Sequence, residues 1–458
     1  MGDIITRSIA MRNKRRIDAL DPRTIYGVAW DKSENPTLTR TDAAVGMEAA
    51  VGVDGQSVHN DFDNAGIFRD IYSVEDAYGN AFIRIPKFYI RKTDTLDAKT
   101  WQISRYKHPG FYLPWCFWDF RHGEELPYFD YGAHKASLSV DNKLESKPGT
   151  YPLVNKTIVQ FRDYARANNV ADLQGYQQLD IHAIDVLRTL MFIEFATLNI
   201  QSVMQGFSSG AYSSSYTATV AENAATRVIV ASATADAFRV GQSISIGTSL
   251  GNTSVFYGRT ITAIEDYNAS NKAIVFDGEP VDIAIGNVVW CSGWKSGFSS
   301  QIAASSGSIG SNADGKYPCM YRGIESPFAD VYQWVDGVNI NDNQAWVCRD
   351  AARYVSNVFA NPYETLAYVN LAENGYPTEM GYDSAHPYAE FPTAIQTAGI
   401  STTKYYSDYY YQAAGQRVAR FGGYWSHGSD CGLSFWYLYS SAASTNALIG
   451  GRLLKKRS

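Results

Sequence analysis

The sequence predicts an α+β fold that carries an inserted small all-β barrel and a β-rich N-terminal region. Three observations favour this class. Short runs of alternating apolar residues fill the first part of the chain, two stretches with helical periodicity follow, and near residue 208 the composition shifts to Ser- and Gly-rich sequence around further alternating runs. At 458 residues the chain exceeds one ordinary core, so two or three domains are expected.

The N-terminal region divides into an arm and a β-rich part. Residues 1–24 hold six basic and three acidic residues and no apolar segment follows, so we expect a solvated arm or docking helix and no secretory signal. Residues 25–139 read as strands and turns, with the clearest strand pair over 81–90, broken at Pro86. The aromatic belt at 110–131 predicts core and subunit interface.

Two helices are expected next. Thr157 can cap a helix that places Ile158, Phe161 and Ala165 on one face, and Asp180 can cap a second. In the second stretch apolar residues recur at spacings of three and four, which predicts a buried stripe. Its members are Ile184, Leu187, Met191, Phe195 and Leu198.

Residues 208–316 are predicted to form an inserted β-barrel. Short alternating runs at 227–230, 242–246, 259–264 and 272–276 are separated by turn residues at intervals typical of a small barrel. The Ser- and Gly-rich stretches 206–216 and 296–315 indicate flexible flanks, where proteolysis should cut first. After the insertion, Asp336-Gly337 predicts a turn between two strands.

Composition and motifs exclude several classes of function. A net charge of -6 and a pI near 5.7 argue against a nucleic-acid partner. Five cysteines without a CxxC pair predict buried free thiols and no zinc site, and no apolar run is long enough for a membrane span.

Catalytic and metal-binding motifs are also missing. The histidines lack HxH or HExxH spacing and no GxSxG is present, so we expect no enzyme, no metal and no cofactor. Asp408, Asp430 and Glu390 remain an alternative as glycosidase carboxylates. Calcium ligands at Asn339, Asn341 and Asp342 fall out of register with an EF-hand loop, which favours a polar turn.

The C-terminal segment carries the strongest signal. Residues 405–439 hold twelve aromatic residues in thirty-five positions, against 14% for the whole chain. The alternation of Leu433, Phe435, Tyr437 and Tyr439 predicts a strand with one face available for recognition. Tyr combines a large contact area with a polar hydroxyl, which suits a binding surface.

This segment resembles a known family. The run from Arg417 to Ser426, followed by Gly432 and by Ile449-Gly450-Gly451-Arg452, is similar to the closing segment of the C-type-lectin-like fold. That fold is shared by formylglycine-generating enzymes, phage tropism determinants and the variable proteins of diversity-generating retroelements. Residues 146–149, 194–201, 321–328 and 332–337 resemble tail-fibre tip proteins. The resemblance implies a C-type-lectin-like receptor-binding domain over 140–207 and 317–458.

What the resemblance implies is a binding protein and a specific set of contact residues. The implied contacts are Tyr424, Trp425, His427, Ser429, Asp430, Phe435, Trp436, Tyr437, Tyr439, Ser440, Ser444 and Asn446. The implied framework is Phe421, Gly422, Gly423, Gly432, Ile449, Gly450 and Arg452. Trp425 is the one contact position better suited to the core. Copper-dependent formylglycine chemistry would need a second nearby cysteine, and Cys431 stands alone.

The function implied is therefore that of a phage tail-tip adhesin. We expect it on the virion, made in the host cytoplasm, bound through its N-terminus to neighbouring tail proteins. We expect a homotrimer that recognises a host cell-surface glycan or protein. The alternatives are a virion-associated glycan-cleaving enzyme and a purely structural tail component.

Overall fold

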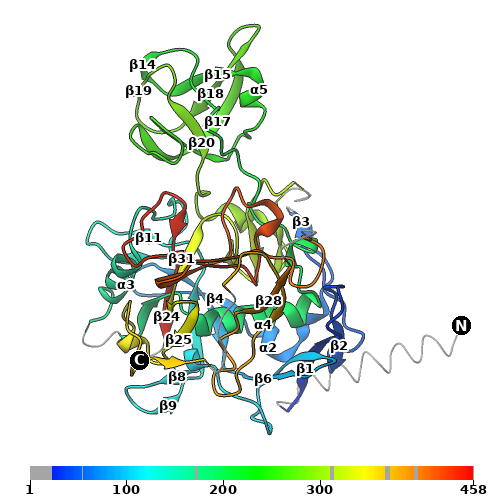
Figure 1. Ribbon diagram of the computed structural model, residues 1–458. Coiled ribbons are helices and arrows are strands. Elements are labelled where there is room, and N and C mark those ends of the chain that lie inside the picture. Colours follow the sequence, from blue (N-terminus) through cyan, green and yellow to red (C-terminus); the bar gives the residue numbers. More distant parts are fainter. Residues whose placement is uncertain are drawn as a thin grey trace, which may run out of the picture.

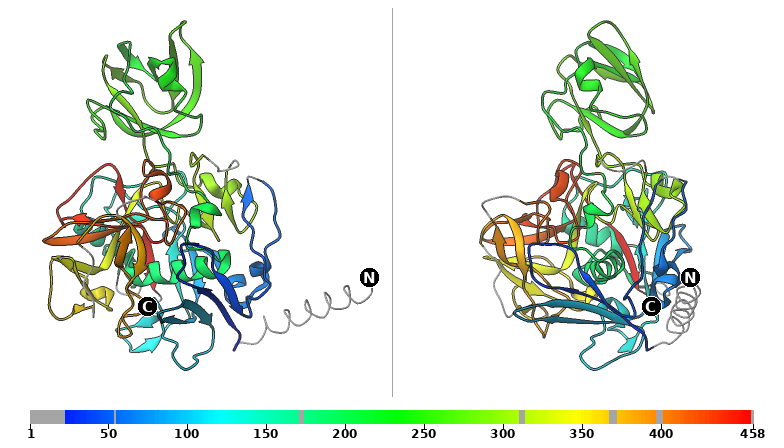
Figure 2. Two further views of the ribbon diagram at one scale, coloured as in Figure 1. Left: turned by 45° about the vertical axis from the view of Figure 1, so that its right-hand side comes forward. Right: turned by 90° about the vertical axis from the view of Figure 1, so that its right-hand side faces the viewer.

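The computed structural model describes residues 23–53, 55–170, 174–309, 314–366, 372–396 and 401–456. A body of several small sheets surrounds helix α4 (Ile181–Phe195), and a lobe built from the middle of the chain stands on the body (Figure 1). Both views in Figure 2 show this lobe projecting from the same end of the body. The predicted N-terminal arm lies, apart from its last two residues, outside the described residues.

The predicted α+β class is wrong, because the chain is mostly β. Strands make up 36% of it and helical residues 12%, with four helices in the described part. Two of these, α2 (Gly66–Arg69) and α5 (Ser232–Ala235), have only four residues each. Only α3 (Ile158–Arg166) and α4 are longer than about one turn, so the helices form no layer of their own. Many small sheets take their place, and the lectin-like arrangement of helix and sheet is not shown.

Both long helices begin where the sequence predicts. Thr157 Oγ1 accepts from the Gln160 amide at 3.1 Å, and Gln160 Oε1 accepts from the Thr157 amide at 3.0 Å, which makes a capping box. Asp180 Oδ1 accepts from the Ala183 amide at 2.9 Å at the start of α4. All fifteen residues of α4 are buried, so this helix lies in the centre of the body.

Two sheets come from the N-terminal part of the chain. The first has the order β2-β1-β7-β6, and the second has the order β13-β33-β10-β5-β4. Their strands are β1 (Ile25–Trp30), β2 (Thr39–Asp42), β4 (Tyr72–Glu75), β5 (Ala81–Pro86), β6 (Tyr89–Asp94), β7 (Lys99–Ser104), β10 (Tyr128–Gly132), β13 (Tyr176–Gln178) and β33 (Leu453–Lys456). The break at Pro86 is confirmed, and it divides β5 and β6 between the two sheets. Because β33 lies between β13 and β10, the last described strand is held inside the N-terminal region.

The largest sheet has seven strands and comes mainly from the C-terminal third. Its main path is β26-β25-β24-β30-β31-β29, and β32 pairs with β24. The strands are β24 (Tyr332–Asn341), β25 (Gln344–Val347), β26 (Glu364–Thr365), β29 (Tyr410–Gln412), β30 (Gln416–Phe421), β31 (Trp436–Ser440) and β32 (Ile449–Gly450). One face of this sheet, with Ala419, Phe421 and Trp436, shares the main hydrophobic core with α4.

The predicted turn at Asp336-Gly337 is wrong. β24 continues through both residues as one strand, and its register against β30 shifts between Val335 and Asn339. Gly337 takes a positive φ of 80° in this bulge, and the Asp336 carboxylate accepts from Arg162 Nε at 2.9 Å. A buried ion pair to α3 thus fixes residues that would otherwise favour a hairpin turn.

Four smaller sheets complete the body. They contain β3 (Gly52–Val53) with β21 (Ser306–Ser308), β22 (Cys319–Tyr321) and β23 (Ile324–Glu325), and the hairpins β8–β9 (Trp118–Asp119, Glu124–Glu125), β11–β12 (Ser137–Leu138, Leu144–Glu145) and β27–β28 (Tyr376–Met380, Pro392–Gln396). Within 296–309 the predicted flexible flank is packed, because β21 pairs with β22 and β3. Glu325 also accepts from the Gly297 and Ser299 amides at 2.7 and 2.9 Å.

The lobe is a small closed sheet. Its order is β15-β18-β17-β16-β20, and β14 pairs with β19 beside it. The strands are β14 (Glu222–Ala225), β15 (Arg227–Ala231), β16 (Ser243–Gly247), β17 (Phe256–Asp266), β18 (Asn271–Phe276), β19 (Val281–Ile283) and β20 (Val288–Cys291). Bridges from Thr217 to Val288 and from Ala218 to Val230 join the two edge strands. The lobe therefore has no long open edge.

The aromatic belt at 110–131 lies largely inside the chain. Phe111, Phe117, Phe129 and Tyr131 are at most 5% exposed, whereas Phe120 is 38% exposed. These buried rings need no partner surface. The homotrimer stays a prediction, and the aromatic belt, which was expected to form a subunit interface, does not support it. In the part of the chain that the structure describes, no helix is long and apolar enough to cross a membrane.

Candidate ligand-binding face

Four tyrosines form one row on the outer side of the seven-stranded sheet. Tyr411 of β29 is paired in parallel register with Tyr437 of β31. Tyr409 and Tyr439 lie two residues away on the same two strand paths, and alternate residues of a strand point to the same side. We call Tyr409, Tyr411, Tyr437 and Tyr439 the tyrosine face. Tyr410, between the first two, points into the core.

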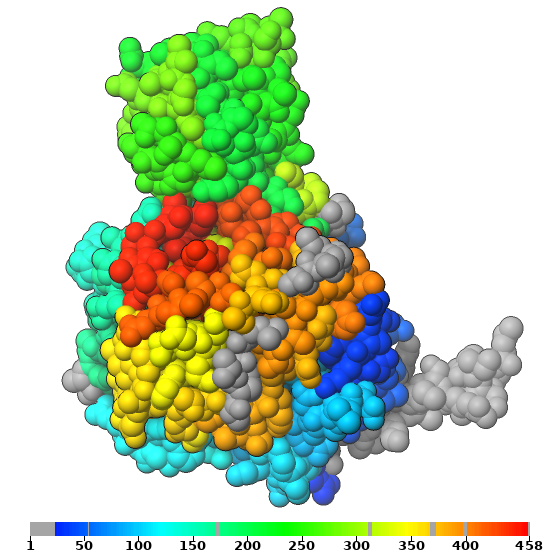
Figure 3. Space-filling model, in the orientation of Figure 1, coloured from blue at the N-terminus to red at the C-terminus, as the bar shows by residue number. Residues whose placement is uncertain are grey.

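The rings of the tyrosine face form a continuous series. Ring centroids are 4.5 Å apart for Tyr409–Tyr411, 5.1 Å for Tyr411–Tyr437 and 5.9 Å for Tyr437–Tyr439. Tyr439 is 53% exposed and the other three are half-buried. In Figure 3 the C-terminal segment, orange to red, covers the surface next to the base of the lobe. The row is therefore held by its neighbours and still open to a ligand.

A neutral histidine lies beside this row. The His427 ring stacks on Tyr411 with a centroid distance of 5.7 Å, and its Nε2 lies 3.2 Å from the Tyr332 hydroxyl. Its Nδ1 is buried without a hydrogen-bond partner. Burial, helped by the nearby Arg420 charge, lowers the pKa of His427 to about 3. The imidazole is thus neutral at physiological pH, with one nitrogen unused.

Arg420 of β30 lies under the same row, and sequence reasoning assigned it no role. Its guanidinium carbon is 3.9 Å from the centre of the Tyr437 ring and 4.5 Å from that of Tyr332. It donates from Nη2 to Ser440 Oγ, while Nε has no hydrogen-bond partner. Burial lowers the pKa of Arg420, a sign of incomplete compensation for lost hydration. A basic residue at alternate spacing from Val418 was the only sequence signal.

The base of the lobe packs directly against this region. Trp425 stacks on Trp290 of β20 at 6.0 Å and 17°, and Tyr212 of the incoming linker contacts both Trp425 and Tyr424. The Trp425 carbonyl accepts from the Gly210 amide at 2.6 Å. The lobe and the tyrosine face therefore share one set of aromatic contacts.

The predicted contact residues divide by exposure. Tyr439, Ser429 and Asn446 are exposed, and Tyr424, His427, Asp430, Tyr437 and Ser444 are half-buried. Trp425, Phe435 and Trp436 are fully buried, and Ser440 is 4% exposed, so these four cannot touch a ligand in this structure. Trp425 packs on the lobe, Trp436 faces α4, and Phe435 lies in the aromatic layer below the tyrosines. The buried position of Trp425 agrees with the expectation from the sequence that this residue suits the core better than a contact surface.

The framework positions lie inside the molecule. Gly423 has a φ of +81°, and a Cβ there would come within 2.5 Å of Cys431 Sγ. Arg452 is fully buried and donates to the carbonyls of Gly132, Glu325 and Ser326. The close packing at Gly423 and the hydrogen bonds of Arg452 hold the last strands against the body.

The carboxylates considered for glycoside cleavage are occupied elsewhere. Glu390 lies between Lys92, Lys99 and Arg188 at 2.6–2.7 Å in the core. Asp408 is fully buried and accepts from the Ser434 amide, and burial raises its pKa well above the usual range. Asp430 is half-buried and accepts from the Tyr376 hydroxyl. Two of the three therefore do not reach the surface where a glycan would bind.

Metal-binding groups are sparse within the described ranges. Asp119, His122 and Glu124 place their ligand atoms within 4.8 Å of one another on the β8–β9 hairpin, a group that is largely exposed. Asn339, the first residue weighed for calcium, uses its amide to donate to the carbonyls of Val355 and Val358. All five cysteines are buried and free, as predicted, so the thiols offer no accessible site.

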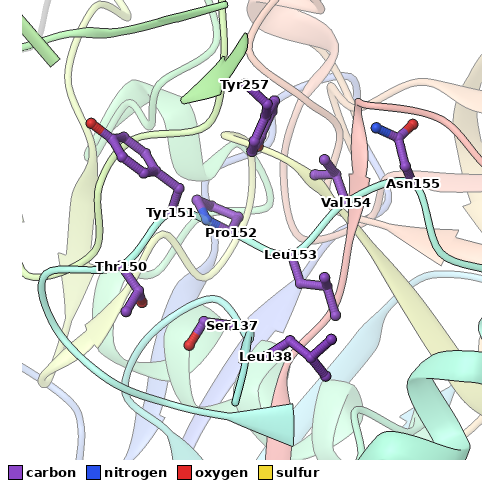
Figure 4. A pocket seen from close by; sticks show the side chains of 9 residues that line it. All are labelled: Ser137, Leu138, Thr150, Tyr151, Pro152, Leu153, Val154, Asn155 and Tyr257. Atoms are coloured by element: carbon purple, nitrogen blue, oxygen red, sulfur yellow. The ribbon is translucent and has the colours of Figure 1, made fainter. Parts of the chain in front are cut away.

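A separate hollow opens where the lobe meets the body. It has a volume of about 390 Å³ and is lined by Ser137, Leu138, residues 150–155 and Tyr257 of β17 (Figure 4). Tyr151 reaches from it to the lobe, with its hydroxyl 2.7 Å from Thr260 Oγ1. The lining has no carboxylate, imidazole or thiol, so it offers shape and apolar contact without acid–base groups. None of the predicted contact residues lines it.

No family model matches the chain, and no curated protein matches it in sequence.

Proposed function

We propose that this protein is a phage tail-tip adhesin that binds a host cell-surface ligand through the tyrosine face. The observation that carries the proposal is the row of four tyrosines, from half-buried to exposed, on an outer sheet surface. Tyr presents an apolar ring and a polar hydroxyl at low entropic cost, which suits reversible recognition. The resemblance of the closing segment to phage tropism determinants supports the same assignment.

A direct binding measurement tests the proposal. Fluorescently labelled protein is incubated with a panel of bacterial strains that differ in surface polysaccharide, and bound protein is counted per cell. Tyr439→Ala should reduce binding about tenfold or more on the responsive strain, since a well-placed interface aromatic contributes about 2 kcal/mol. The variant should keep the wild-type melting temperature, because Tyr439 is 53% exposed.

The chain offers a matched control. Tyr72 of β4 is also 53% exposed and belongs to a different sheet, so Tyr72→Ala should leave binding unchanged. Equal loss in both variants, or no adhesion to any strain by the wild type, would reject an adhesin and favour a structural tail component. Release of reducing sugar ends from bound polysaccharide would instead indicate the glycan-cleaving alternative.

A further inference from the structure

Two buried polar atoms beneath the tyrosine face have no partner. Arg420 is only 8% exposed, its Nη2 donates to Ser440 Oγ, its Nε makes no hydrogen bond, and within the described part of the chain its guanidinium forms no ion pair. His427 Nδ1, beside Tyr411, is also buried and unpaired. They belong to a larger set of buried side-chain atoms without a partner in the described residues, and these two lie together beneath the tyrosine face, where a bound ligand could satisfy them.

The other buried arginines of the described residues have carboxylate or carbonyl acceptors, although Arg188 Nε also lacks a hydrogen-bond partner. Arg162 pairs with Asp336, Arg188 with Glu390 and Arg322 with Glu194. Arg452 has no carboxylate partner but donates to three carbonyls and to Gln333 Oε1. Arg420 has instead the hydroxyl of Ser440 and the faces of aromatic rings, which return only part of the lost hydration of a guanidinium. Among these five buried arginines, Arg420 alone has neither a carboxylate nor a backbone carbonyl as its partner.

We propose that the tyrosine face binds an acidic saccharide, whose carboxylate pairs with Arg420 while its ring packs on Tyr411 and Tyr437. This inference rests on the proposed function and names the class of its ligand. Tyr437 covers the guanidinium and is itself half-buried at the surface, so rotation of its side chain opens the path to Arg420. A planar carboxylate matches the fork of a guanidinium, and pairing supplies the charge that the fold omits.

The arrangement favours a sugar over a protein partner. Ring centroids along the tyrosine face are 4.5 to 5.9 Å apart, a spacing comparable to one pyranose ring. Each tyrosine offers an apolar ring face to sugar C–H groups and a hydroxyl to sugar oxygens. The unpaired His427 Nδ1 is a further hydrogen-bonding position for a sugar hydroxyl.

Titration with simple glycosides tests the inference. The full chain, labelled on arginine and tyrosine side chains, is titrated by NMR with α- and β-methyl glycosides of the common hexuronic acids. The corresponding neutral hexosides and 6-sulfated hexosides serve as matched probes. We expect at least one uronide to bind tenfold or more tightly than its neutral counterpart and to shift the Arg420 Nε–H and Tyr437 ring signals.

Variants separate charge from stacking. Arg420→Gln should bind the uronide and the neutral glycoside equally, while Arg420→Lys should keep part of the preference. Tyr437→Ala should weaken binding of both glycosides and keep their ratio. If Arg420→Gln does not fold, the wild type and Arg420→Lys still test the inference, because the preference for acidic sugars is measured by comparing the uronide with its neutral glycoside on one protein.

Several results would overturn the inference. They are equal binding of uronide and neutral glycoside, failure of every uronide to shift the Arg420 signals, and tighter binding of the sulfated probes. Competition for cells by a surface protein alone would also overturn it. Loss of cell binding by Tyr439→Ala without any preference for acidic sugars would leave the adhesin standing and remove only the acidic ligand.

Discussion

At the scale of single residues, Tyr439 and Gly423 have different roles: we expect Tyr439 to serve binding and Gly423 to serve folding. The Tyr439 side chain is 53% exposed, and its loss should cost binding and not folding. Gly423 has a φ of +81° and faces Cys431, so a side chain there should cost folding. Burial also raises the pKa of Cys431 well above its usual value, which marks that contact as part of the interior. Recognition and framework thus occupy neighbouring positions of one segment.

Gly423→Ala should destabilise the protein by about 3 kcal/mol. The left-handed backbone costs a side chain about 1 kcal/mol, and a Cβ within 2.5 Å of Cys431 Sγ adds a steric penalty. Gly428→Ala is the matched control, since Gly428 has a φ of +56° and open space around its missing Cβ. It should show the backbone cost alone. Chemical denaturation measures both, and equal losses would mean that the Cys431 contact relaxes freely.

At the scale of elements, the lobe and the large sheet meet through Trp425. Its ring is fully buried between Trp290 and Tyr212, so the segment that leads into β31 also fixes the base of the lobe. The incoming linker is tied to the same residue through the Gly210 amide. The lobe should therefore keep a defined orientation beside the tyrosine face.

Trp425→Ala should loosen this junction. Removal of a fully buried Trp costs about 3 to 5 kcal/mol, and hydrogen exchange over 207–216 should accelerate because its packing partner is gone. Trp101→Ala is the control, since Trp101 is also buried but packs on Phe192 of α4. It should lower stability without faster exchange in the linker. Identical exchange patterns would show that the lobe docks through other contacts.

At the scale of the whole molecule, the buried histidines should lower stability on mild acidification, whereas Asp408 and Asp330, whose pKa values are raised by burial, act in the opposite direction. Burial lowers the pKa of His427 to about 3 and that of His182 to about 4, whereas both are near 6.5 in the unfolded chain. Between these values the histidines of the unfolded state bind more protons, so their contribution to the free energy of unfolding decreases as pH falls from 6.5 toward 4. His427 alone should contribute a loss of about 2 kcal/mol by pH 5.

Urea denaturation at pH 7 and pH 5 measures this loss. His427→Gln should remove the His427 share of this loss, and His59→Gln, a change at an exposed site, should leave the pH dependence unchanged. A His427→Gln variant with the same difference in free energy of unfolding between pH 7 and pH 5 as the wild type would contradict a neutral buried His427.

Local sequence determined much of the secondary structure. The caps at Thr157 and Asp180 and the alternating runs that became β15, β16, β17 and β18 follow from short-range pattern. These features depend on neighbours along the chain, whose preferences a single sequence contains. The fold class did not follow, because the content of short strands joined over long distances in sequence has no local signature.

Only the tertiary structure decided the candidate site. Parallel pairing of β29 with β31 brings Tyr409 and Tyr411 beside Tyr437, and no pattern within either segment predicts that register. Antiparallel pairing of β30 with β31 places Arg420 opposite Tyr437, and Trp436 lies in the core shared with α4, although the family resemblance implied Trp436 as a contact. Which side of a strand meets solvent depends on what packs on the other side, and that is a property of the whole fold.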